Sequence, residues 1–158
     1  MSWIGEHGNT EILAVPIDTT GAVVASDWLS MAHYDHVDLH ILQGAWAGGT
    51  PAVTLDQATA AAGTGTKTLS FVTYYSKTAL TGTAWTKTAV TSDTFSLTAV
   101  ANILTVIPID ADQLDADNDF TFLQLDIASP GANADLICCW ATFSRPRFAQ
   151  ESAVDAIS

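Results

Sequence analysis

Residues 36–43 read HVDLHILQ, and apolar and polar side chains alternate along this segment. Successive side chains of an extended chain point to opposite faces. The apolar set (Val37, Leu39, Ile41) therefore shares one face, and the polar set (His36, Asp38, His40) shares the other. This alternation predicts a strand with one face in the core and one face turned outward.

Similar short runs recur along the chain, separated by Gly, Pro, Asn and Asp, and strong helix formers at helical spacing are scarce. The pattern is typical of an all-β domain. Strands are predicted at Ile12–Ile17, His36–Gln43, Ala52–Gln57, Lys67–Ser76, Ala84–Val90, Thr94–Ala99, Ile103–Ile109, Phe120–Ile127 and Leu136–Phe143. One helical turn is expected within Asp110–Asp117. The predicted fold is a single-domain antiparallel β-sandwich or jelly-roll-like barrel at residues 11–148, with short arms at residues 1–10 and 149–158.

Composition excludes several classes of function. The 158 residues carry a net charge of −12, and only 14% of them are charged. Such a field repels phosphate backbones and anionic membrane surfaces, so we expect no nucleic-acid partner and no membrane partner. Residues 1–10 lack the pattern of a secretory signal, and the adjacent Cys138 and Cys139 form no disulfide framework. Assembly in a reducing cytoplasm is therefore expected.

Two clusters contain residues of the kind that bind metals. His36, Asp38 and His40 would project from one strand face, where imidazole and carboxylate suit transition metals. Alternate residues on one strand lie about 6–7 Å apart, so a single ion would need help from a partner strand.

The second cluster, Asp115, Asp117 and Asp119, has oxygen ligands at calcium-loop spacing, but Phe120 stands where an EF-hand loop needs glycine. We interpret the two clusters as a polar strand face and a solvated acidic turn, and predict no metal and no cofactor.

Catalytic motifs are not apparent. No Gly-x-Ser-x-Gly elbow surrounds a serine, no phosphate-binding loop is present, and nothing singles out one carboxylate pair among the many Asp residues. The sequence therefore predicts a protein that is not an enzyme.

The five tryptophans allow a different function. Trp46 stands among small residues in GAWAGG (residues 44–49), which would leave its ring exposed or inserted into a neighbouring molecule. Trp3 lies in the N-terminal arm, whereas Trp28 and Trp140 are interpreted as core residues. Exposed tryptophan on a β-sandwich can stack on sugar rings, so a carbohydrate-binding, lectin-like module on a virion or cell surface is an alternative. The interface candidates are Trp3, Trp46, His36 and His40.

Several longer segments resemble a known group of proteins. The run HILQGAWAGGT (residues 40–50) continues into VTLDQA (53–58) and the Gly63–Phe71 segment, and PGANA (130–134) precedes the closing SRPRF (144–148). These segments, with Leu114–Phe120, resemble small β-rich virion proteins encoded in the head-gene regions of tailed bacteriophages. The similarity covers about residues 30–148, and its motifs are structural rather than catalytic.

The resemblance implies a head decoration (cement) protein. Such a protein would bind the major capsid protein on the capsid surface and stabilise the shell without catalysis. A homo-oligomer is implied, and a trimer would suit the local three-fold axes of a lattice. A tail or head–tail connector component is a second alternative, because the motifs do not separate these positions in the virion.

Overall fold

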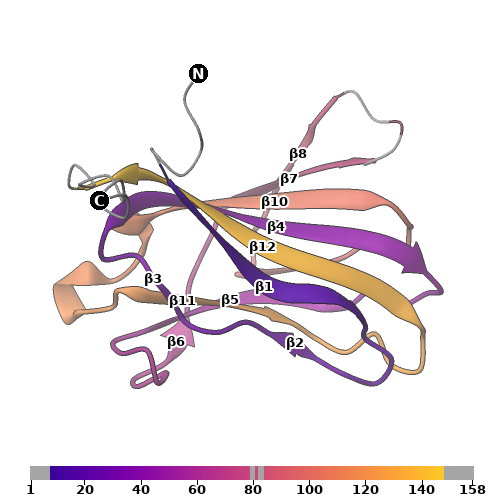
Figure 1. The fold of residues 1–158 in the computed structure, drawn as a ribbon, viewed down its shortest axis with the longest axis horizontal. Helices are drawn as coiled ribbons and strands as arrows, with labels where there is room; N and C mark the ends of the chain where they lie inside the picture. Colours follow the sequence, from indigo (N-terminus) through magenta and orange to yellow (C-terminus); the bar gives the residue numbers. More distant parts are fainter. Residues whose placement is uncertain (1–7, 79–80, 82–83, 148–158) are drawn as a thin grey trace, which may run out of the picture.

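The computed structural model describes residues 8–78, 81 and 84–147. Within these residues the chain forms two antiparallel sheets that enclose one core (Figure 1). The strands are β1 (Asn9–Asp18), β2 (Val24–Ala25), β3 (Leu29–Ser30), β4 (Tyr34–Trp46), β5 (Ala52–Ala58), β6 (Lys67–Thr68), β7 (Thr73–Thr78), β8 (Thr86–Ala89), β9 (Thr94–Ser96), β10 (Ile103–Asp110), β11 (Phe122–Ile127) and β12 (Asp135–Pro146). The predicted all-β sandwich is confirmed.

Sheet A has the order β1-β12-β4-β10-β7-β8 among the described strands. The long strands β12 and β10 flank β4, so the segment 36–43 lies in the middle of this sheet (Figure 1). Sheet B has the path β2-β11-β5-β6, with β3 also paired to β11 and β9 paired to β5.

Alternate residues of the central strands fill the space between the sheets. Val37, Leu39 and Ile41 of β4 have no exposed surface, as the alternation in 36–43 predicts. From the opposite sheet, Leu123 and Leu125 of β11 are equally buried. Because both sheets bury one face only, the other face of each is left for solvent or for partners.

One predicted strand is wrong in a way that affects the fold. Lys67–Ser76 is not a single strand: β6 pairs with β5 in sheet B, and β7 pairs with β10 in sheet A. The residues between them cross from one sheet to the other and bury Leu69 and Phe71, which are 1% and 2% exposed. The apolar residues at 69 and 71 have strand spacing, so the sequence pattern does not reveal the crossing.

Smaller differences concern the ends of elements. β11 begins at Phe122 rather than at 120, and the two-residue strands β2 and β3 are too short to give a sequence pattern. The helical turn expected in Asp110–Asp117 is observed as two 3-10 turns, η1 (Ala111–Gln113) and η2 (Ala116–Asn118).

The predicted arms fall largely outside the described residues. Residues 149–158 and the first seven residues lie outside them, whereas β1 begins at Asn9, within the range 1–10. No helix in the described part of the chain has the length and apolar character needed to span a membrane.

Candidate functional site

His36, Asp38 and His40 project from the outer face of β4, opposite the core residues, but they do not converge on one point. The ring nitrogens of His36 face two carboxylates, with Nδ1 2.8 Å from Asp110 Oδ1 and Nε2 3.2 Å from Asp38 Oδ1. His40 instead stacks on Trp140, with ring centroids 4.8 Å apart and an interplanar angle of 4°. Among the described residues, no group of three or more His, Cys, Asp or Glu side chains is arranged to hold a metal ion.

The acidic turn is arranged around an ion pair. Lys67 Nζ donates to Asp115, and Asn118 Nδ2 lies 2.9 Å from each oxygen of the same carboxylate. The hydrogen bond from Lys67 is the main reason that the pKa of Asp115 lies below its ordinary value. Asp117 and Asp119 are exposed on the same turn and take no part in this cluster.

A second ion-pair cluster closes one end of sheet A. Asp110 accepts hydrogen bonds from His36 and Arg145, and the Nε of Arg147 lies 2.6 Å from Asp35 Oδ1. The bond from His36, followed by the charge of Arg145, holds the pKa of Asp110 below its ordinary value of 3.8. Its ionised form is therefore favoured by folding.

The lowered pKa of Asp110 predicts that the protein loses stability at acidic pH. The Asp110 carboxyl ionises more readily in the folded chain than in the unfolded chain. Its contribution to the free energy of unfolding is therefore complete above pH 3.8, and it is lost as the pH falls through the lower pKa of the folded state. The side chain is 48% exposed, so we expect Asp110→Asn to cost only about 0.5–1 kcal/mol near pH 5. In urea unfolding, the difference in the free energy of unfolding between the wild type and Asp110→Asn should become smaller towards about pH 2.5. Asp112→Asn, an exposed neighbour without an ion pair among the described residues, should show no such gap.

The outer face of sheet A carries a row of side chains that crosses all of its strands. The register pairs place them side by side in the order Ile12, Trp140, His40, Val106, Tyr75 and Lys87. This row is mostly apolar or aromatic although it faces away from the core. Trp140, which the sequence assigns to the core, belongs to this row instead, because it follows the buried Cys139 by one residue.

Cys138 and Cys139 are both free thiols. Burial raises the pKa of Cys139 to about 12, so this thiol is uncharged at neutral pH. A protonated, enclosed thiol is a weak nucleophile. Cys139 therefore acts as a small apolar core residue.

The other tryptophans lie apart from one another. Trp46 is half-buried against the core, and its indole Nε1–H donates to the carbonyl of Gly49 at 3.2 Å. The ring is therefore held by its own loop rather than projecting freely. Trp28 is half-buried beside Gly63, and Trp3 lies outside the described residues.

The edge of sheet A exposes apolar side chains. Ile12 and Val15 of β1 are 65% and 61% exposed, and Leu136 of the adjoining β12 is 43% exposed. We call these three residues the β1 patch. Among the described strands β1 pairs only with β12, so the patch lies along an edge of sheet A (Figure 1).

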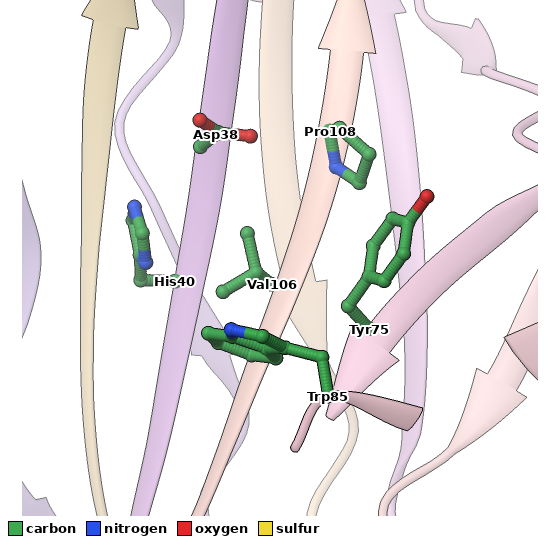
Figure 2. Close-up of a pocket in the computed structure, with 6 residues that line it drawn as sticks. All are labelled: Asp38, His40, Tyr75, Trp85, Val106 and Pro108. Carbon is green, nitrogen blue, oxygen red and sulfur yellow. The ribbon is translucent and has the colours of Figure 1, made fainter. Parts of the chain in front are cut away.

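A pocket lies at the other side of the same outer face, between β4, β10, β7 and the start of β8. Its volume is about 380 Å³, and it is lined by Asp38, His40, Tyr75, Trp85, Val106 and Pro108 (Figure 2). Sequence reasoning missed this pocket, because four separate segments supply its walls. One signal was available: Leu104, Val106 and Pro108 alternate with the core residues of β10, so both faces of that strand are apolar.

Comparison with known proteins gives little further information. No family model and no curated protein matches the chain. A crystal structure of the SPBc2 prophage-derived protein YomS is similar, with a TM-score of 0.49 and 9% sequence identity, over 87% of this chain and 93% of that one. Likeness at this level assigns neither a family nor a function to the chain.

Proposed function

We propose that this chain is a non-enzymatic structural protein of a tailed-phage virion that binds the capsid lattice and stabilises the head. Its partners would be the major capsid protein and further copies of itself, with a trimer as the favoured assembly. The proposal combines the resemblance of residues 30–148 to phage head proteins with one structural observation, the β1 patch. This open edge is the contact surface that we assign to the shell.

The patch supports binding to protein for an energetic reason. Full burial of an Ile, Val or Leu side chain contributes about 1.5–3 kcal/mol, so three such residues on one edge favour association. The surrounding molecule carries a net charge of −12. Mutual repulsion of free copies keeps such a chain soluble until a complementary surface covers the patch.

The form of β1 indicates contact through side chains rather than through backbone pairing. Its register with β12 is irregular between Ile12 and Ala14 and again between Ala14 and Ile17, and Pro16 lacks an amide hydrogen. Bulges and proline are features that prevent an edge strand from adding another strand. A partner would therefore cover Ile12 and Val15 without extending sheet A.

The test is co-sedimentation of the purified protein with capsids of the phage that encodes it. The double variant Ile12→Asp, Val15→Asp should bind at least about tenfold more weakly, because each change removes apolar contact and buries a carboxylate. A matched control is Val72→Asp, which alters a residue that is 69% exposed outside the patch and adds the same kind of charge. This control should bind as the wild-type protein does.

Equal binding by the double variant and the wild type would contradict the assignment of the patch. The wild-type protein could instead bind isolated tails or necks and not capsids. That result would contradict head decoration and support the tail or connector role. Circular dichroism of each variant separates loss of binding from loss of folding.

A further inference from the structure

The pocket on the outer face of sheet A has the composition of a small-molecule site. Ligand sites are mostly apolar and aromatic, with a few convergent polar groups. Figure 2 shows the Trp85 ring beside Val106, with Asp38 and His40 on one side and Tyr75 and Pro108 on the other. Aromatic, apolar and polar groups thus surround one opening.

The aromatic walls are held in place by neighbouring cations. Trp85 is 46% exposed, and Lys77 Nζ lies 4.6 Å from the centroid of its ring. Lys87 Nζ lies 6.0 Å from the Tyr75 ring. Neither lysine lines the pocket. Cation–π attraction of this kind favours the observed positions of the two rings, and both rings line the pocket.

The polar groups are suited to hydroxyl groups. Asp38 uses Oδ1 towards His36, and its Oδ2 has no partner among the described residues. The Tyr75 hydroxyl also makes no hydrogen bond to the described part of the chain, so it can donate or accept. Burial lowers the pKa of His40, which favours the neutral ring; its Nδ1 is buried without a hydrogen-bond partner and is therefore not open to a ligand.

Charge limits the kind of ligand. A cationic guest would be attracted by Asp38, but it would compete with Lys77 and Lys87 for the faces of the two aromatic rings. An anionic guest would meet the Asp38 carboxylate and the field of a molecule with net charge −12. A neutral ligand avoids both conflicts if it has an apolar face for Trp85 and hydroxyl groups for Asp38 and Tyr75.

We propose that this pocket binds a neutral pyranose ring, so that the protein has a carbohydrate-binding site in addition to its structural role. The axial C–H groups of the sugar would stack on Trp85, while its ring hydroxyls donate to Asp38 and pair with Tyr75. This inference goes beyond capsid attachment and does not depend on it. The pocket extends from β4 to the residue before β8, whereas the β1 patch lies on β1 and the start of β12, so different residues form the two sites.

The experiment is a titration of the full chain followed by the Trp85 indole N–H signal in two-dimensional NMR. The probes are methyl glucoside, methyl galactoside, methyl mannoside and N-acetylglucosamine, with sorbitol as an acyclic polyol and glucuronate as an anionic sugar. One small ring should bind with a Kd of roughly 1–10 mM. We expect at least one neutral pyranoside to shift Trp85, sorbitol to leave it unchanged, and glucuronate to bind more weakly than methyl glucoside.

Two variants locate the binding. Trp85→Ala should weaken binding of the responding sugar roughly tenfold or more, followed through the signal of Tyr75. Trp28→Phe, which changes a half-buried tryptophan just before β3, should leave the affinity unchanged. Asp38→Asn should weaken binding of the neutral sugar. It should also reduce the ratio between the affinity for that sugar and the affinity for glucuronate.

The proposal is overturned if no neutral pyranoside shifts Trp85 at about 50–100 mM, roughly five- to tenfold above the weakest expected Kd. It is also overturned if Trp85 responds to protein concentration alone, since the pocket is then a contact between copies. Trp85→Ala should still sediment with capsids, and the Ile12→Asp, Val15→Asp variant should still bind sugar. Failure of one proposal is thereby separated from failure of the other.

Discussion

Replacing Phe143 by Ala is expected to lower the free energy of unfolding by about 3–5 kcal/mol, the usual cost of removing a buried aromatic ring. Phe143 is 2% exposed and lies on β12, opposite Val37 of β4. Its ring centroid is 5.1 Å from that of Tyr34, at an interplanar angle of 38°. The substitution therefore opens a cavity where β4 and β12 meet the core.

Urea unfolding followed by circular dichroism measures this effect. The matched control is Phe122→Ala. Phe122 is only half-buried on β11, so its replacement should lower the free energy of unfolding clearly less. Equal losses for the two variants would contradict the placement of Phe143 at the centre of the core.

Replacing Asp135 by Ala is expected to cost about 2–4 kcal/mol, because it leaves two backbone donors without their acceptor. Asp135 is fully buried at the start of β12, and its Oδ1 accepts from the amides of Ala47 and Gly48 at 2.6 and 3.2 Å. These bonds fix the turn that follows β4. In that turn Gly49 has a φ of +84°, and a Cβ there would lie 2.9 Å from the carbonyl oxygen of Pro130.

Asp135→Asn is the informative comparison. It keeps one oxygen for the two amides and removes the charge from Oδ2, which is buried without a partner. We expect it to cost less than Asp135→Ala in urea unfolding. Hydrogen exchange should show that the amides of Ala47 and Gly48 lose protection in the Ala variant only. Similar exchange in the two variants would show that the carboxylate does not hold this turn.

The sequence predicts those parts of the fold in which a single strand contains the whole signal. The alternation in 36–43 correctly predicts the buried face of β4, because burial on one face has a period of two residues. The switch between β6 and β7 escapes prediction, since Leu69 and Phe71 keep that period while the chain changes sheets. A local pattern does not show which sheet a strand joins.

The candidate sites show the same limit. His36 and Asp38 share a face as predicted, but the partner of His36 is Asp110, which is 74 residues away in the chain. The pocket depends on pairing of Val106 with both His40 and Tyr75. Trp140 is placed on the wrong face by the sequence because β12 is apolar on both sides, so its hydrophobicity does not mark the inward direction.

If a tailed phage encodes this chain, as proposed, the most direct test of the structural role is cryo-electron microscopy of the particles of that phage. The account predicts regular copies of the sandwich on the outer capsid, with Ile12, Val15 and Leu136 covered by the major capsid protein or by a neighbouring copy. Density confined to the tail or neck, or complete absence of the chain from the particle, would contradict it.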